Sequence, residues 1–194
     1  MADFWQTLQQ MDQFLFFFIN GRLHFPFLDW AMVFITEKEN WYIPLAILWG
    51  VLIWKGGRRG RILALLLPIA VGTSDAISSH LLKPWVGRFR PCKTLEGFRL
   101  LVSCGGIYSF PSSHATNIAT LAGLFAMFYP ASRWFWIVVA FLVGTSRIYV
   151  GVHYPADVAA GYLLGITVAF VYYKGSMRIF PLNPNHAINR EFRE

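Results

Sequence analysis

Cations, histidines and a carboxylate occur in three short clusters of this 194-residue chain, each beside a long apolar segment. Arginine and lysine can hold the nonbridging oxygens of a phosphate, and a histidine can attack phosphorus or transfer a proton. A carboxylate can orient such a histidine and stabilise its charged form. Together these are the groups that phosphoryl transfer through a histidine requires. In chain order the clusters are Lys83 to Pro91, Pro111 to His114, and Ser146 to Asp157.

The first two clusters supply groups that bind an anion. Lys83 and Arg90 lie in a segment with prolines and a glycine, so the chain turns between them. Ser112, Ser113 and His114 precede a charge-free segment, and the unpaired N–H groups and dipole of a helix start attract phosphate. Each cluster also has a plain structural interpretation. The first could be a basic loop at lipid headgroups, and the second a helix N-cap with an interfacial histidine.

The third cluster combines Arg147, His153 and Asp157. The carboxylate follows the histidine by four residues, a spacing at which helical neighbours contact each other. The pair is either catalytic or a local structural hydrogen bond. No cage of acids, cysteines and histidines suited to zinc, calcium or magnesium accompanies the clusters, so we expect neither a metal ion nor another cofactor.

The composition predicts that membrane-spanning helices position these clusters. Hydrophobic residues make up 56% of the chain and charged residues 14%, against roughly 25% charged residues in an average soluble domain. Five apolar segments are candidates for transmembrane helices. They are Trp41 to Trp54, Ile62 to Leu82, Ala115 to Tyr129, Trp134 to Val150, and Ala156 to Tyr173. We therefore expect an all-α integral membrane bundle with the clusters at helix ends on one membrane face.

The N-terminal segment is less regular. Apolar residues recur at helical spacing from Phe4 to Ile19, and Asn20 and Gly21 then interrupt the pattern. We interpret the segment as a helix lying in the membrane interface, followed by a short apolar turn from Phe27 to Ile35. The alternative is a sixth span from Phe14 to Ile35. The predicted division is an N-terminal segment of residues 1–40, a transmembrane core of residues 41–174 with the motif loop 83–113, and a polar cytoplasmic tail of residues 175–194.

The distribution of lysine and arginine predicts the orientation of the bundle. If the basic loop Lys55 to Arg61 is cytoplasmic, alternating spans leave all three clusters on the opposite face. The cytoplasmic side leads clearly in cations once Lys83, Arg90 and Arg147 are assigned to chemistry. We expect a multi-pass protein of the inner membrane with its active site facing the periplasm or exterior. The net charge of +7 suits anionic headgroups, and we expect no nucleic-acid partner.

The clusters resemble, in order and internal spacing, the three-part signature of the type 2 phosphatidic acid phosphatase family. The matching patterns are Lys83-x6-Arg90-Pro91, Pro111-Ser112-Ser113-His114, and Ser146-Arg147-x5-His153-x3-Asp157. Ser113 stands where the family usually has glycine. Its backbone N–H remains available to a phosphate, but its side chain could narrow the pocket or require a φ that glycine adopts more easily.

The resemblance implies a role for each matched residue. His153 would attack phosphorus to give a phosphohistidine, Asp157 would hold its other ring nitrogen, and His114 would protonate the leaving oxygen. Water would then hydrolyse the intermediate. The residues implied in binding the phosphate are Lys83, Arg90, Ser112, Ser113 and Arg147.

Four residues near the signature have less certain assignments. Arg88 is a candidate for contacting the phosphate or a second charged group of the substrate. Asp75 lies about two helical turns before Lys83, and it either orients a basic residue of the site or is satisfied by neighbouring hydroxyl groups. Cys92 and Cys104 are either a disulfide that braces the motif loop on an oxidising face or two unpaired thiols.

We expect an integral membrane phosphatase that hydrolyses a terminal phosphate monoester or diphosphate of a bilayer lipid. The resemblance suggests phosphatidylglycerophosphate, undecaprenyl diphosphate, lipid A and phosphatidic acid as substrates, and the sequence leaves both this choice and the oligomeric state open. The alternative enzyme is a lipid phosphotransferase that uses the same histidine. The alternative that is not an enzyme is a transporter that only binds phosphate. The related vanadate-dependent haloperoxidases are soluble, which disagrees with five apolar spans.

Overall fold

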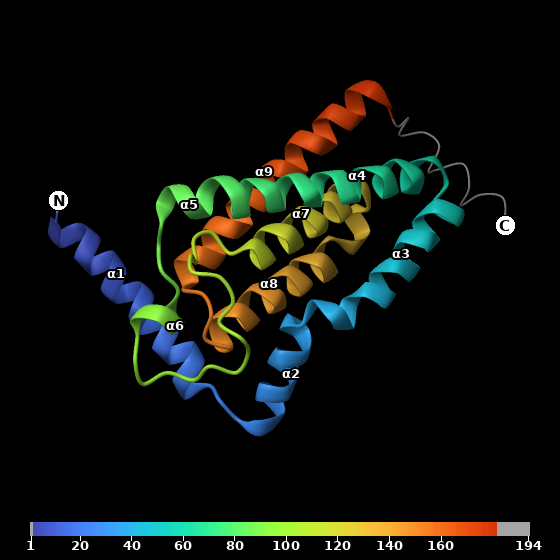
Figure 1. The fold of residues 1–194 in the computed structure, drawn as a ribbon. Coiled ribbons are helices and arrows are strands. Elements are labelled where there is room, and N and C mark those ends of the chain that lie inside the picture. Colours follow the sequence, from blue (N-terminus) through green and yellow to red (C-terminus); the bar gives the residue numbers. More distant parts are fainter. Residues whose placement is uncertain (1, 182–194) are drawn as a thin grey trace.

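The computed structural model describes residues 2–181, and every regular element in that range is helical (Figure 1). The all-α prediction is confirmed. An isolated antiparallel bridge joins Phe89 and Tyr108 in the loop before α7. The α-helices are α1 (Ala2–Phe17), α2 (Pro26–Thr36), α3 (Tyr42–Trp54), α4 (Gly57–Ala76), α5 (Lys83–Val86), α6 (Pro91–Thr94), α7 (Ser113–Phe128), α8 (Arg133–Tyr149) and α9 (Pro155–Ile179). Two π-helices, η1 (Phe18–Arg22) and η3 (Ile77–Leu82), and two 3-10 helices, η2 (Lys38–Trp41) and η4 (Pro130–Ser132), complete the set.

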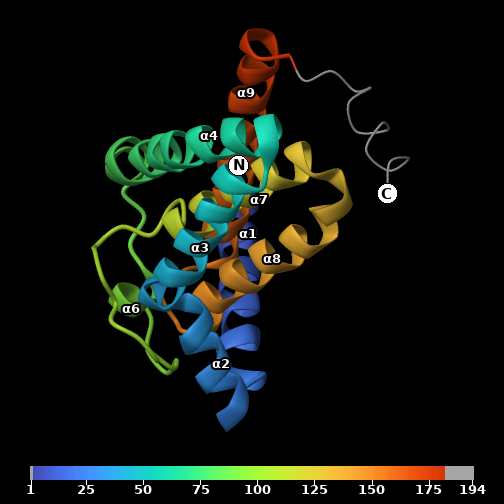
Figure 2. The same ribbon diagram turned by 90° about the vertical axis from the view of Figure 1, so that its right-hand side faces the viewer.

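Helix α7 lies in the middle of the bundle, and α4, α8 and α9 pack around it (Figure 2). Its contact with α9 is close because α9 presents glycines. A Cβ atom on Gly165 would lie 2.3 Å from the carbonyl oxygen of Thr116, and one on Gly161 would lie 2.7 Å from that of Ser112. Farther along α7, the fully buried Leu124 belongs to the main apolar cluster. The glycines therefore bring the first turns of α7 and α9 together.

Two helices within residues 2–181 are long and apolar enough to cross a bilayer. One is the continuous run Gly57–Val86, in which α4 passes into η3 and then α5, and the other is α9. Helices α3, α7 and α8 lie in the predicted segments but are shorter. The outer surface is apolar, as Leu65 and Leu163 show with exposed fractions of 67% and 69%. The number of spans stays a prediction.

The N-terminal region differs from the expected pattern at two places. Helix α1 continues without a break into η1, because Asn20 is buried and donates to the carbonyl oxygens of Arg99 and Tyr149, both at 2.7 Å. The expected apolar turn from Phe27 to Ile35 is the helix α2, which has Pro26 in its first turn, where proline is well tolerated. In Figure 1, α1 crosses the end of the bundle at which α9 begins.

The C-terminal helix also extends farther than expected. Helix α9 runs to Ile179, past the predicted end at Tyr173 and into the segment predicted as a polar tail. The remainder of that tail, from residue 182 onward, lies outside the described residues. The division of the chain at residues 40 and 174 stays a prediction.

Candidate active site

The three signature clusters meet at one end of the bundle because each lies where a helix begins or ends there. Lys83 follows η3, Ser112 is the N-cap of α7, and Arg147 lies in the last turn of α8. His153 occupies the short loop between α8 and α9, and Asp157 lies in the first turn of α9. The sequence-predicted residues therefore lie in or next to the ends of several different helices.

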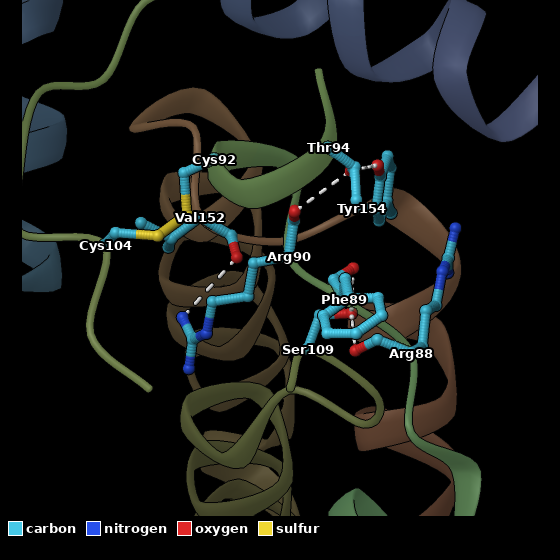
Figure 3. The surroundings of a disulfide bond; sticks show 9 residues. All are labelled: Arg88, Phe89, Arg90, Cys92, Thr94, Cys104, Ser109, Val152 and Tyr154. Carbon is cyan, nitrogen blue, oxygen red and sulfur yellow. Dashed lines mark hydrogen bonds between the residues drawn. A yellow bond between two sulfur atoms is a disulfide. The ribbon is translucent and has the colours of Figure 1, made fainter. Parts of the chain in front are cut away.

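Hydrogen bonds tie the first cluster to the other two. Nζ of Lys83 donates to the carbonyl oxygen of Pro111 at 2.5 Å. Nη1 of Arg90 points to the carbonyl oxygen of Val152 at 3.5 Å, beside the start of α6 (Figure 3). The cations of the first cluster therefore lie next to the backbone of the segments that carry His114 and His153.

His153 and Asp157 form a buried pair. Their side chains are at most 2% exposed, and Nδ1 of His153 lies 3.4 Å from Oδ2 of Asp157. The same carboxylate oxygen accepts the backbone N–H of Tyr154 at 2.8 Å, which fixes the carboxylate beside the ring. Burial, followed by the positive charges of Arg90 and Arg147, holds the pKa of His153 well below its ordinary value of 6.5. The imidazole is therefore neutral near pH 7, the state in which it can act as a nucleophile.

Arg90 and Arg147 place two buried cations at this pair. Their exposed fractions are 9% and 8%, and in the described part of the chain the Nε atom of each lacks a hydrogen-bond partner. Nη1 of Arg147 donates to the hydroxyl of Thr36 at 2.5 Å. Burial lowers the pKa of Arg90, and the charge of Asp157 opposes that shift. Buried donors without a partner are costly unless a ligand satisfies them, so the two guanidinium groups suit an anion.

The start of α7 has the form of a helix N-terminal anion site. The hydroxyl of Ser112 caps the helix by accepting the N–H of Ala115 at 3.5 Å. The hydroxyl of Ser113 is hydrogen-bonded to those of Ser78 and Ser79 in η3, at 2.8 and 3.0 Å. Ser113 also has a negative φ, so its position does not require glycine. Its side chain is held by η3, and the backbone N–H groups of Ser113 and His114 stay available to an anion.

Arg88, a candidate for contacting the phosphate, forms ion pairs with two carboxylates. Its Nη1 donates to Oδ1 of Asp157 at 2.8 Å, and its Nη2 donates to Oδ2 of Asp12 at 2.5 Å. Sequence reasoning missed Asp12. The signal that could have found it is its position, since it is an acid within the apolar helical pattern from Phe4 to Ile19.

The structure also shows the partners of Asp75, Cys92 and Cys104, for which the sequence left alternatives open. Oδ1 of Asp75 accepts the side-chain amide of Asn117 at 2.8 Å, a partner that the sequence did not suggest. Cys92 and Cys104 form a disulfide with their Cα atoms 6.1 Å apart (Figure 3). Thr94, in the same stretch, contacts the hydroxyl of Tyr154 at 3.0 Å. The motif loop is thereby fastened to itself and to the start of α9.

Curated relatives share the sequence over most of its length. The chain is 32% identical to the lipid A 4'-phosphatase of Porphyromonas gingivalis, over 87% of this chain and 74% of that protein. It is 32% identical to the undecaprenyl-diphosphatase of Sulfolobus acidocaldarius, over 74% and 68% of the two chains. It is 31% identical to phosphatidylglycerophosphatase B of Bacillus subtilis, over 75% and 74%.

Solved structures share the fold. A transmembrane PAP2-type phosphatidylglycerolphosphate phosphatase from Bacillus subtilis superposes with a TM-score of 0.71 at 26% identity, over 91% of this chain and 90% of that one. LpxE of Aquifex aeolicus superposes with a TM-score of 0.63 at 27% identity, over 82% and 93%. The sequence profile of the PAP2 superfamily matches residues 61–180, which hold all three signature clusters. The chain therefore belongs to the PAP2 superfamily and is a phosphatase.

Proposed function

We propose that this chain is an integral membrane phosphatase that removes a terminal phosphate from a lipid through a phosphohistidine on His153, without a metal ion. The observation that carries the proposal is the buried pair of His153 and Asp157 beside two arginines with unpaired Nε atoms. Within residues 2–181, no group of three or more His, Cys, Asp or Glu side chains is placed to hold a metal. Positive charge at the site comes from arginine and lysine instead.

In the first step, Nε2 of His153 attacks phosphorus while Nδ1 keeps its proton in the hydrogen bond to Asp157. The bond between phosphorus and the lipid oxygen breaks, and His114, which the negative charge of the bound phosphate would keep protonated, gives its proton to that oxygen. In the second step, His114 takes a proton from a water molecule whose oxygen attacks the phosphoryl group. The phosphorus–nitrogen bond breaks, inorganic phosphate leaves, and His153 returns to its neutral form.

The anion site would hold the phosphoryl group through both steps. Its charge is spread over the nonbridging oxygens, and fixed donors stabilise that charge without having to reorganise. Arg90 and Arg147 bring unpaired donors to this position. The groups assigned to the phosphoryl oxygens are the side chains of Lys83, Arg90, Arg147 and Ser112, and the backbone N–H groups of Ser113 and His114.

The proposed placement in the membrane has α3, the run Gly57–Val86, α7, α8 and α9 as spans, with α1 in the interface. The apolar outer surface and the likeness to a transmembrane phosphatase support it. We assign the active-site end to the periplasm or exterior of an inner membrane. The disulfide between Cys92 and Cys104 lies at that end and supports an oxidising outer face.

Phosphate release from four lipids tests the proposal and identifies the substrate. Purified protein in detergent is given phosphatidylglycerophosphate, undecaprenyl diphosphate, lipid A or phosphatidic acid. At least one lipid should release phosphate, His153→Ala should abolish the release, and a chelator should leave the rate unchanged. His186 lies outside the signature, so His186→Ala serves as the control.

Three outcomes would count against the proposal. Release that persists in His153→Ala would contradict the mechanism. Transfer of the phosphoryl group to an added acceptor lipid, in place of free phosphate, would indicate a phosphotransferase. Lipid movement across a vesicle membrane that continues in His153→Ala, without any phosphate release by the unmodified protein, would indicate a transporter.

A further inference from the structure

Arg88 joins two carboxylates that lie far apart in the sequence. One belongs to Asp157, whose other oxygen faces His153, and the second belongs to Asp12 on α1. The guanidinium group also lies over the ring of Tyr154, with its central carbon 4.1 Å from the ring centre. Arg88 is therefore held in one orientation by both acids and by an aromatic face.

Asp12 is built into the start of α9 as well. It is 8% exposed, and its Oδ1 accepts the backbone N–H of Ala156 at 2.8 Å. That N–H lies in the first turn of α9, where a helix has no internal partner for it. Oδ1 of Asp12 thus holds the backbone of Ala156, which precedes Asp157. Oδ2 of Asp12 holds Arg88, which pairs with Asp157.

Packing by Phe16 keeps Asp12 in this place. Phe16 follows by four residues and so lies on the same face of α1. It is fully buried, and its ring lies 5.6 Å from that of Tyr154 and 5.7 Å from that of Phe98. Helix α1 therefore contacts the active-site end through one apolar and one charged anchor.

The charges of Asp12, Arg88 and Asp157 together determine how much negative charge lies next to His153. One arginine shared between two carboxylates leaves a net negative charge, whereas Arg88 paired with Asp157 alone would leave none. The cations Arg90, Arg147 and Lys83 also act on His153, and so does His114 when it is protonated. An imidazolium forming on His153 during catalysis thus depends on the negative charge of Asp157 for its stabilisation.

We propose that Asp12 is a positioning residue for the catalytic pair, which acts through Arg88 to hold Asp157 and to preserve the negative charge that Asp157 presents to His153. The inference rests on the proposed function of His153 and Asp157. It gives α1, which lies outside the three signature clusters, a part in the reaction.

The test compares Asp12→Asn with Asp29→Asn in the 194-residue chain. Asp29 on α2 pairs with Arg99 in the motif loop. Both variants therefore remove a carboxylate from an arginine, but only Asp12 is linked, through Arg88, to Asp157. Phosphate release is measured on the lipid with the highest turnover in the four-lipid panel. Asp12→Asn should lower kcat roughly tenfold, the change that accompanies about one unit in pKa, with little change in KM. Asp29→Asn should keep the unmodified kcat.

The pH profile separates positioning from a general loss of stability. Removing a negative charge lowers the pKa of His153 further, so the acidic limb of kcat/KM should move to lower pH in Asp12→Asn and stay in place in Asp29→Asn. Asp12→Glu keeps the negative charge, so the acidic limb of kcat/KM should stay at the same pH as in the unmodified protein. In an Arg88→Gln background, Asp12→Asn should cause no further loss, because the effect passes through Arg88.

An unchanged kcat and limb in Asp12→Asn, or losses that add in the double variant, would overturn the inference. Should Asp12→Asn not accumulate as folded protein, Asp12→Ser replaces it with the same expectations, since serine also removes the negative charge and adds no bulk. Failure of the unmodified protein to release phosphate from any lipid would instead refute the proposed function itself.

Discussion

The backbone N–H of Ser112 donates to the backbone carbonyl oxygen of Asp157 at 2.9 Å. This bond fastens the N-cap of α7 to the first turn of α9. The groups assigned to phosphate binding and the pair assigned to catalysis are therefore joined directly. Their relative position depends on the close packing of the same two helices at Gly161 and Gly165.

A side chain at Gly165 should separate these helices. Its Cβ would lie 2.3 Å from the carbonyl oxygen of Thr116 and 2.7 Å from the Cβ of Ala119. We expect Gly165→Ala to lower the free energy of unfolding by about 1–3 kcal/mol and to lower kcat. Thermal unfolding in detergent and phosphate release measure the two effects. Gly175→Ala on the same helix has open space around the new methyl group and should be neutral or slightly stabilising, so equal results for the two variants would contradict the prediction.

Ser113→Ala should reduce stability more than activity. The hydroxyl of Ser113 is hydrogen-bonded to Ser78 and Ser79, and its loss should cost about 1–2 kcal/mol of unfolding free energy. The backbone N–H at this position remains, so kcat should change little. Ser78→Ala is the matched variant, and the two losses should not add in the double variant. A large fall in kcat without a fall in stability would show that the Ser113 hydroxyl contacts the substrate.

The acidic limb of the pH profile should lie below the ordinary histidine range. Burial and the nearby arginines hold the pKa of His153 well below 6.5, so the free enzyme keeps a neutral nucleophile as the pH falls through 6.5. The rate constant kcat/KM should then fall only when the pH approaches the lowered pKa, because protonation removes the attacking lone pair. A pH series of kcat/KM measures this limb. A limb at or above 6.5 would contradict the assignment of His153 as a buried, neutral nucleophile.

Arg147→Lys should impair catalysis although the charge is retained. Lysine has no planar fork, so its ammonium group cannot reproduce the geometry in which Arg147 donates to Thr36 and presents a second donor to the phosphoryl group. We expect kcat/KM to fall roughly 100-fold, the scale for removing one fixed donor from a transition-state oxyanion. Thr36→Val, which removes only the hydroxyl partner, should cost less. Equal losses in both variants would mean that Arg147 acts mainly by holding α2.

The three signature clusters could be read from the sequence because the residues of each cluster are closely spaced. His153 and Asp157 lie four residues apart, and Ser112 directly precedes an uninterrupted helix. Residues so close in the sequence stay close in space, so each cluster could be recognised from its spacing alone. The apolar composition likewise predicted helices, since the segments are long and carry few charges.

Contacts between distant segments could not be read in the same way. Asp12 reaches Arg88 and Ala156 only because α1 crosses the end of the bundle, and no local pattern encodes that crossing. The sequence predicts a break in the helix at Asn20, since asparagine beside glycine often forms a turn. It remains helical because two carbonyl oxygens from the motif loop and α8 accept its amide. Tertiary hydrogen bonds outweighed local preference there.

In the proposed placement, the continuous helix Gly57–Val86 sets the depth of the active site. Its 30 residues, at 1.5 Å each, extend about 45 Å, whereas the hydrocarbon layer of a bilayer is about 30 Å thick. With Arg58 and Arg59 among the headgroups of one leaflet, Lys83 would reach the headgroups of the other. The phosphate of a lipid already resides at that level. Such an enzyme could dephosphorylate its substrate without lifting the lipid out of its leaflet.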